Sequence, residues 1–536
     1  MKLLHRGGAA VLVGLLGWVP MYGAETVQPK SVIRHVIVIF QENVSFDHYF
    51  ATYPYALNPP GEPKFTALPG TPRVEGLSGQ WLTQNPNFLN EQNGLGRANP
   101  FRLRRDQAVT ADQDHNYQAE QLAYNNGKMD LFPKSVGSAD GPHVPGEKKG
   151  VPSTTGLTMG YFDGNTVTAY WNYAQHFAMS DHQFDVIFGP STPGAINLVS
   201  GQTNGVVDDQ NSAGSIVSDG NDGFTLIADP QPFDDVCSST SDGLVHMTGR
   251  NIGDMLTEAK VSWGFFQGGF DLGVVNPNGT TGCRRSSSSL ADMRKRDYLP
   301  HHEPFQYYKS TANPDHARPK SIKTIGTNED GEANHQYDTH DFVDALKGGN
   351  FPEVSFLKAP AYQDGHAGYS SPLDEQKFVV EMINLIQQQP DWEHTVVIIA
   401  YDDSDGWYDH LMGPVANGSE SELDQLNGDG KCGNGATALG GVDPATKHAQ
   451  GRCGFGPRLP LLVISPWAKP NYVDHTVTDQ TSILRLIEDT YLGGKRIGGG
   501  SFDAQSGSLN GMFDFSKNKP QNERRVLLDP QTGLVQ

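Results

Sequence analysis

The sequence predicts an α/β fold in which a mainly parallel central sheet is flanked by helices and interrupted by loop-rich insertions. Three stretches indicate this fold because each is apolar on consecutive residues: 32–40 (VIRHVIVIF), 395–400 (TVVIIA) and 459–464 (LPLLVI). Consecutive apolar residues are typical of strands that are buried on both faces, as in parallel sheets covered by helices. Residues 354–357 and 261–266 are weaker candidates for further strands.

Helical segments alternate with these strands. The sequence predicts helices over residues 117–125, 166–177, 373–389 and 480–492. The last of them carries Ile483, Leu484 and Ile487 at helical spacing, which predicts one buried face. Strands that alternate with helices are typical of α/β domains.

The 536 residues include 61 glycines and 35 prolines, which predicts many turns and long loops. We expect a signal peptide at 1–24 and a single catalytic domain at 25–536, with insertions around 51–110, 205–340 and 413–456. The signal peptide is predicted by two basic residues ahead of a short apolar run, AAVLVGLLGW. Such a leader predicts a periplasmic or secreted protein. We expect no integral membrane segment after its removal, and no accessory domain after the last helix.

Charge and cysteine content narrow the function. Forty basic and 61 acidic residues give a formal net charge of −21, which disfavours binding to nucleic-acid phosphates. The four cysteines form an even, sparse set in a chain expected to be exported, which predicts two disulfides. Pairing of neighbours in sequence gives Cys237–Cys283 and Cys432–Cys453. Free buried thiols are the alternative.

Two pairs of residues with side-chain oxygens follow predicted strands, and we call them the acidic pairs because three of the four residues are acidic. Glu42 and Asn43 come just after the strand at 32–40, and Asp402 and Asp403 just after the strand at 395–400. Ligands of open α/β sheets gather at the carboxyl ends of strands, and adjacent carboxylates repel one another unless a cation binds them. These residues therefore predict a shared divalent cation site. The alternatives are a helix cap for the first pair and an ordinary turn for the second.

A hydroxyl is predicted at the start of a further helix. The segment 189–194 (GPSTPG) leads into an apolar stretch, so we expect a helix to begin near Ser191. The positive end of a helix favours an alkoxide and a phosphate, which makes Ser191 a candidate nucleophile. A plain helix cap by Ser191 or Thr192 is the alternative. The chain contains no G-x-S-x-G, the motif of α/β-hydrolase serine nucleophiles.

Several of the 18 histidines lie in polar contexts. His115 precedes a predicted helix, His301 and His302 are adjacent, and His366 follows Asp364 and a glycine. Imidazoles bind anions, ligate metals and transfer protons near neutral pH. Each of these histidines has a structural role as its alternative.

Three stretches together resemble the bacterial phosphoesterase family: 41–50 (QENVSFDHYF), 189–194 (GPSTPG) and 401–410 (YDDSDGWYDH). That family contains secreted acid phosphatases and non-specific phospholipases C, and its core is related to alkaline phosphatase and arylsulfatase. The resemblance implies a single phosphoesterase domain that uses one divalent ion, with Ca²⁺, Mg²⁺, Mn²⁺ and Zn²⁺ all open. It implies Ser191 as the nucleophile. The implied metal ligands are Glu42, Asn43, Asp402 and Asp403, and the implied phosphate-site histidines are His115, His301, His302 and His366.

The resemblance implies an exported, metal-dependent phosphoric-ester hydrolase. The segment Pro193-Gly194-Ala195 resembles the acid-phosphatase branch, so we expect action on phosphomonoesters through a phosphoserine. Because several histidines surround the phosphate, with His366 as a candidate proton donor to the leaving oxygen, we expect an acidic pH optimum. One alternative is a phospholipase C that hydrolyses phospholipid phosphodiesters. Another is a non-catalytic exported protein that binds cations or glycans. The first two take small phosphate esters or phospholipids as substrates.

Overall fold

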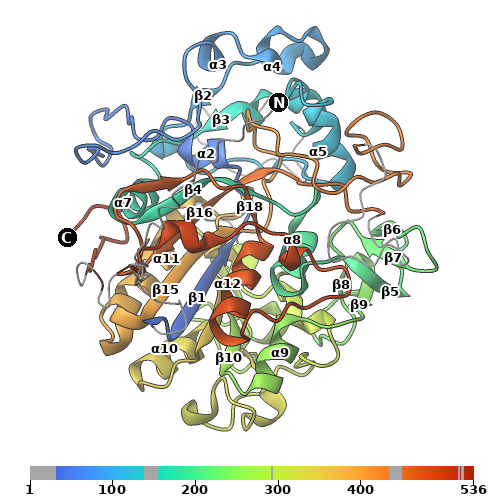
Figure 1. Cartoon of the computed structure of the whole chain (residues 1–536), viewed down its shortest axis with the longest axis vertical. Helices are drawn as coiled ribbons and strands as arrows, with labels where there is room; N and C mark the ends of the chain where they lie inside the picture. Colours follow the sequence, from blue (N-terminus) through green and yellow to red (C-terminus); the bar gives the residue numbers. More distant parts are fainter. Residues whose placement is uncertain are drawn as a thin grey trace, which may run out of the picture.

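A computed structural model describes residues 32–137, 155–290, 292, 294–433, 450–516, 520 and 524–536. The predicted signal peptide lies outside these residues. The described chain is built around one large sheet that crosses the middle of the molecule (Figure 1). No described helix has both the length and the apolar character needed to cross a membrane.

The large sheet has nine strands. In pairing order they are β13 (Gln336–Tyr337), β10 (Trp263–Gln267), β14 (Val354–Lys358), β1 (His35–Gln41), β15 (Thr395–Tyr401), β16 (Arg458–Ile464), β4 (Ala178–Phe184) and β17 (Tyr472–Asp474), with β18 (Thr478–Asp479) also paired to β4. All five strands expected from apolar runs are present. The expectation of a mainly parallel sheet is wrong, because the sheet is mixed: β16 runs antiparallel to both β15 and β4. A continuous apolar run reports burial on both faces and carries no information on strand direction.

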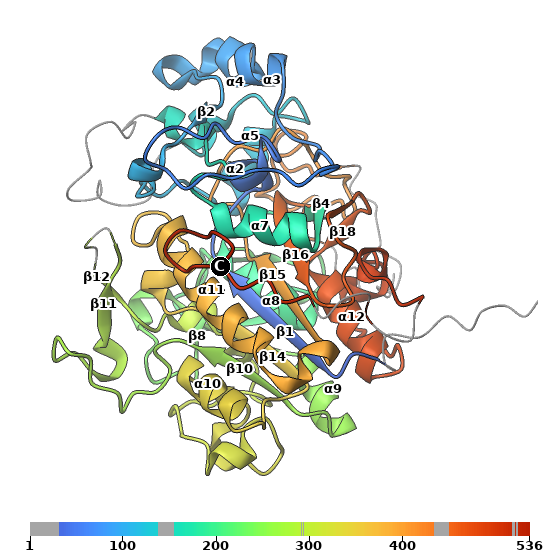
Figure 2. The same ribbon diagram turned by 90° about the vertical axis from the view of Figure 1, so that its left-hand side faces the viewer.

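Helices cover both faces of this sheet. Figure 2 shows α10 and α11 on one side of the strands and α9 and α12 on the other. The four helices expected from the sequence are α5, α7, α11 and α12, and the helix expected at Ser191 is α8. The helices are α2 (Phe46–Phe50), α3 (Gln80–Thr83), α4 (Pro86–Leu89), α5 (Tyr117–Tyr124), α6 (Phe132–Ser135), α7 (Thr168–His176), α8 (Ser191–Ser200), α9 (Ile252–Ala259), α10 (Thr339–Lys347), α11 (Pro372–Gln387) and α12 (Thr481–Tyr491).

A smaller sheet lies within the region expected to be a loop-rich insertion. Its five strands pair in the order β6 (Ile216–Ser218), β7 (Phe224–Leu226), β5 (Asn204–Gln210), β9 (Leu244–Met247) and β8 (Gln231–Pro232), and it lies beside α8 (Figure 1). Two further pairs of short strands are β2 (Phe101–Arg102) with β3 (Gly160–Tyr161), and β11 (Ser286–Ser288) with β12 (Arg294–Arg296). Polar residues on short, partly exposed strands gave no sequence signal for the smaller sheet.

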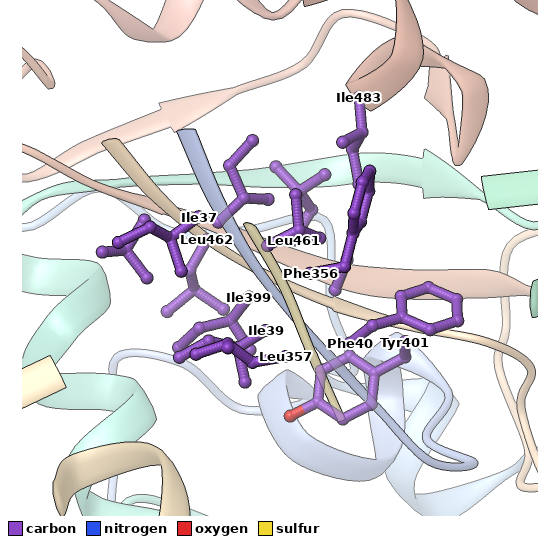
Figure 3. Packing of buried hydrophobic residues seen from close by; sticks show 14 of the residues in the cluster. Ile37, Ile39, Phe40, Phe356, Leu357, Ile399, Tyr401, Leu461, Leu462 and Ile483 are labelled. Atoms are coloured by element: carbon purple, nitrogen blue, oxygen red, sulfur yellow. The ribbon is translucent and has the colours of Figure 1, made fainter. Parts of the chain in front are cut away.

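The core fixes the level at which the central strands end. Ile37 and Ile39 of β1 pack with Ile399 of β15 and with side chains of β14 and β16, and all are buried (Figure 3). Burying one such side chain contributes about 1.5–3 kcal/mol. The register of β1 on β15 pairs Gln41 with Tyr401, so both strands end together. The residues that follow therefore emerge side by side at one edge of the sheet.

Both predicted disulfides are confirmed. Cys237 is bonded to Cys283 with a Cα–Cα distance of 5.2 Å, and Cys432 to Cys453 with a distance of 5.7 Å.

Candidate functional site

The loops after β1 and β15 are joined where the acidic pairs lie. The Asp402 amide donates to the Gln41 carbonyl (3.2 Å), and the Val44 amide donates to the Asp403 carbonyl (2.9 Å). Asn43 has a φ of 53°, in the left-handed region that asparagine tolerates better than most residues. In this conformation its amide donates to Asp402 Oδ1 at 3.0 Å. The backbone thus holds the two pairs together.

Ser191 faces these two loops as the first residue of α8. Its Oγ lies 3.0 Å from Asp403 Oδ2, 3.2 Å from Glu42 Oε2 and 3.5 Å from Asn43 Oδ1, and the serine is buried. A serine hydroxyl has one proton, so it satisfies only one of three acceptors. The side-chain oxygens of Ser191, Glu42, Asn43 and Asp403 thus converge with only the serine proton among them. Such a group of oxygen ligands suits a hard divalent cation. The residues present therefore fit a metal ion.

Gly194 allows α8 to come this close. A Cβ atom on Gly194 would lie 2.1 Å from the Asp402 carbonyl oxygen, so any side chain would push the first turn of α8 away from the loop after β15. At the same helix end, the Thr192 amide donates to Asp229 Oδ1 at 2.8 Å. Asp229 lies between β7 and β8, so the smaller sheet also contributes to this helix terminus.

Lys358 is a site residue that sequence reasoning missed. It ends β14, and its Nζ lies 3.3 Å from Asp402 Oδ2 and forms an ion pair with Glu42. The other Asp402 oxygen accepts the amides of Asn43 and Asp403. The signal was available, because Lys358 directly follows the predicted strand at 354–357 and so belongs to the same sheet edge as the two acidic pairs.

The carboxylates of the site exceed its cations. Burial and the charge of Asp402 raise the pKa of Glu42 well above its usual value, and burial raises that of Asp403. Burial also acts to raise the pKa of Asp402, but Lys358 and two backbone amides outweigh it and lower that pKa. Three buried carboxylates thus face Lys358 and a protonated His115, and a bound cation would offset the remaining repulsion.

The structure brings the four candidate histidines to this site. His115 Nε2 lies 3.3 Å from Asn43 Nδ2, and His302 Nδ1 lies 3.2 Å from Glu42 Oε1. The His301 ring packs edge-on against His302 at 4.3 Å, and the His366 ring lies 6.0 Å from His115.

Their environments make these histidines chemically different. Burial acts to lower the pKa of His115, but nearby carboxylates, Asp403 first, raise it to about 10. Burial lowers the pKa of His366 to about 4 and also lowers those of His301 and His302. His115 therefore carries a proton at neutral pH, whereas the other three are neutral.

Two further acidic residues that the sequence analysis did not select lie beside the histidines. The Asp364 Oδ2 atom is 4.0 Å from His302 Nδ1, and the Asp405 Oδ1 atom is 3.4 Å from His115 Nδ1. Both carboxyl groups are buried, and burial raises both pKa values well above the usual range. Each lies two residues from a selected position, so proximity in sequence was the available signal.

A second buried charge cluster joins the same two loops, and we call it the clasp. It contains Asp47, Asp409, His410 and Arg458. Asp47 accepts from His410 Nδ1 (2.6 Å) and from Arg458 Nη2 (3.1 Å), and Asp409 accepts from Arg458 Nε (3.1 Å) and from the Asp47 amide (3.1 Å). Two carboxylates therefore face two cationic side chains. Asp47, Asp409 and His410 belong to the stretches that carry the family resemblance. The clasp gives these three residues a structural role, because they are held by ion pairs and hydrogen bonds within it.

Comparisons with known proteins find phospholipases C among the relatives of this chain. The non-hemolytic phospholipase C of Pseudomonas aeruginosa is 24% identical over 475 residues, which cover 86% of this chain and 54% of that protein. Phospholipase C A of Mycobacterium tuberculosis is 23% identical, over 100% of this chain and 88% of that protein. The chain thus spans a little over half of the Pseudomonas relative.

Among solved structures, murine ectonucleotide pyrophosphatase/phosphodiesterase 5 aligns with 65% of this chain and 95% of its own, at 12% identity and a TM-score of 0.29. We transfer nothing from that similarity. The profile of the Phosphoesterase family, by contrast, matches residues 33–492, a range that includes β1, α8 and β15 and therefore every residue of the site. The chain belongs to the Phosphoesterase family, a family of phosphoric-ester hydrolases.

Proposed function

We propose that this protein is an exported, divalent-metal-dependent phosphatase that acts on phosphomonoesters through a phosphoserine at Ser191. The observation that carries the proposal is the position of Ser191 Oγ, within 3.5 Å of three side-chain oxygens at the N-terminus of α8. In this proposal Glu42, Asn43, Asp402 and Asp403 hold one divalent ion. The predicted leader and the two disulfides support a periplasmic or secreted location.

The reaction begins at Ser191. A bound divalent ion would lower the cost of forming the serine alkoxide and polarise a phosphoryl oxygen. Ser191 gives its proton to the Asp403 carboxylate, whose Oδ2 lies 3.0 Å from Oγ, and Oγ attacks phosphorus in line, so that the Oγ–P bond forms and the bond to the leaving oxygen breaks. The positive end of the α8 dipole stabilises charge on the equatorial oxygens.

Proton transfers are divided between two histidines in this proposal. His115, whose pKa is raised to about 10, suits the donor of a proton to the leaving oxygen. His366, whose pKa is lowered to about 4, suits the acceptor of a proton from the water that hydrolyses the phosphoserine. The low pKa of His366 argues against its expected role as the proton donor, and His115 takes that role here. Because His366 is neutral well below pH 7, this division also accommodates the expected acidic optimum. His301 and His302 line the phosphate position.

A phospholipase C is the second candidate, and the comparisons favour it. The curated relatives named above are phospholipases C, which cleave phosphodiesters. Both candidates use the same serine and cation, so they differ only in what binds beyond the phosphate. The rate ratio between para-nitrophenyl phosphate and phosphatidylcholine vesicles separates them. A higher kcat/KM for phosphatidylcholine would replace our first proposal by the second.

The test of the mechanism is Ser191→Ala. We expect a loss of at least about 1,000-fold in kcat on both substrates, because removal of a nucleophilic serine in other hydrolases costs up to about 10⁶-fold. Ser200→Ala, at the other end of the same helix, is the matched control and should retain activity. Wild-type turnover by the Ser191 variant would refute both candidates. A chelator-sensitive melting temperature with no hydrolysis of any phosphate ester would instead support the cation- or glycan-binding alternative.

A further inference from the structure

A second cluster of metal-ligating side chains lies in the sheet itself, away from the residues assigned to the phosphate site. It is made by Asp181 and His182 of β4 and by His475, which lies between β17 and β18. We call it the β4 histidine cluster.

An irregularity in β4 gives this cluster its geometry. Leu459 of β16 pairs with Gln183, and Leu461 pairs with Ser180, so β4 has one more residue than β16 across this interval. A bulge of this kind re-aims side chains and lets neighbours along the strand converge. His182 Nδ1 accordingly lies 2.8 Å from Oδ1 of the preceding residue, Asp181.

The third side chain comes from the far side of β4. Strands β17 and β18 both pair with β4, and the short connection between them places His475 over the bulge. Its Nδ1 atom lies 2.8 Å from the same Asp181 Oδ1, and the two imidazole rings are perpendicular with centroids 5.9 Å apart. All three ligand atoms lie within 4.8 Å of one another.

The charge and exposure of the cluster suit an ion that enters from solvent. The Asp181 side chain is fully buried, and although burial acts to raise its pKa, hydrogen bonds from His182, the Glu75 amide and His475 lower it. The His475 side chain is 62% exposed, so one edge of the cluster is open to water. Glu75 stands at this edge, with Oε2 3.9 Å from His182 Nε2.

We propose that Asp181, His182 and His475 form a second cation site, selective for a borderline metal ion such as Zn²⁺ or Cu²⁺. Two imidazole nitrogens and one carboxylate oxygen are the ligands that such ions prefer, whereas the all-oxygen set at Ser191 suits harder ions. Two ligand atoms that bind Zn²⁺ at about 2.0–2.1 Å in a tetrahedron lie roughly 3.3 Å apart. Each 2.8 Å distance between a histidine Nδ1 and Asp181 Oδ1 would therefore lengthen by about 0.5 Å when the ion binds. Water completes the tetrahedron.

The bound ion has a structural role in this proposal. It joins the β17–β18 connection to β4, whose chain continues through residues 185–190 to Ser191. An ion that binds only the folded protein raises its stability with concentration. The site therefore fastens the edge of the sheet that leads to the nucleophile.

Zinc titration of metal-free protein by calorimetry tests the proposal. The variants are His475→Gln and His182→Gln, and the matched control is His246→Gln, a partly exposed histidine paired with a single carboxylate, Asp209, at 2.7 Å. We expect wild type and His246→Gln to bind one more equivalent of Zn²⁺ than His475→Gln or His182→Gln. Equal stoichiometry in all four proteins would overturn the proposal.

Two further readouts keep the test independent of catalysis. With Cu²⁺, electron paramagnetic resonance should show coupling to two imidazole nitrogens that is lost in His475→Gln. Saturating Zn²⁺ should also raise the melting temperature of wild type more than that of His475→Gln. Identical copper spectra, or identical zinc-induced shifts in melting temperature, would show that the cluster is an ion pair only.

Discussion

The loops after β1 and β15 carry two buried charge clusters that differ in their balance. In the clasp, Asp47 and Asp409 face two cations, Arg458 and His410, and each carboxylate accepts hydrogen bonds from them or from backbone amides. In the site cluster, three carboxylates and the Ser191 hydroxyl face two cations, Lys358 and the protonated His115. The clasp has as many cations as carboxylates, whereas the site cluster has one carboxylate more than its cations. Within one pair of loops, charge balance thus separates a structural ion network from a place built for a cation.

The largest effect should come from unbalancing the clasp. Arg458→Met keeps much of the apolar stem but removes the guanidinium, whose Cζ lies 4.3 Å from the centre of the Phe46 ring, and so leaves Asp47 and Asp409 buried with one fewer cation. We expect the free energy of unfolding to fall by about 3–5 kcal/mol in denaturant titration. The control combines Arg458→Met with Asp47→Asn and Asp409→Asn, which removes the stranded charges and should recover most of the loss. A loss below about 1 kcal/mol would show that the clasp is not a structural network.

A smaller and opposite effect is expected at the site cluster. In chelator, Asp403→Asn should raise the free energy of unfolding by about 1 kcal/mol, because it removes one of three crowded carboxylates whose burial is unfavourable. With Mn²⁺ at 100 times its dissociation constant, wild type should gain about 2.7 kcal/mol, and the variant less, so the order of stability reverses.

The matched control for this reversal is Asp47→Asn in the clasp. Burial acts to raise the pKa of Asp47, but His410 and Arg458 lower it, so the stability of this variant should fall both in chelator and in Mn²⁺. If Asp403→Asn instead loses stability in chelator, the site cluster is balanced without a cation and the contrast with the clasp fails.

The smallest effect should appear in the pH dependence of the clasp. Burial acts to lower the pKa of His410, but Asp47 raises it above its usual value. A histidine whose folded pKa is raised contributes stability that is full below its unfolded pKa and is lost as pH rises through its folded pKa. Unfolding free energies measured from pH 6 to 10 should therefore decline on the alkaline side in wild type. The decline should be shallower in His410→Gln, and equal slopes would show that His410 does not charge in the clasp.

Much of the fold could be predicted from the sequence because the central strands are apolar on both faces. The run at 32–40 predicted β1, and the runs at 395–400 and 459–464 predicted β15 and β16, each within a few residues. Strand β4 was missed because AMSDHQF places Ser180, Asp181 and Gln183 in the interior. Tertiary ion pairs and hydrogen bonds make that burial tolerable, and a single sequence does not display them.

The candidate site was more predictable than its charge balance. The acidic pairs and Ser191 were found because strand ends and helix starts are local features that gather at one edge of a sheet. Lys358 was missed although it directly follows the predicted strand at 354–357, because only acidic and amide residues at strand ends were considered as metal ligands. The clasp could not be derived at all, since Asp47 and Arg458 are 411 residues apart and meet only through the order of β4, β16 and β15.

The missing side chain at position 194 has a consequence for relatives of this protein. Because a β-carbon there would overlap the Asp402 carbonyl oxygen, a homologue that carries alanine or a larger residue at the corresponding place must seat this helix farther from the loop. Where such a homologue retains the aspartates and the serine, its hydroxyl would stand farther from them. The spacing of helix and loop would then differ between branches of the family.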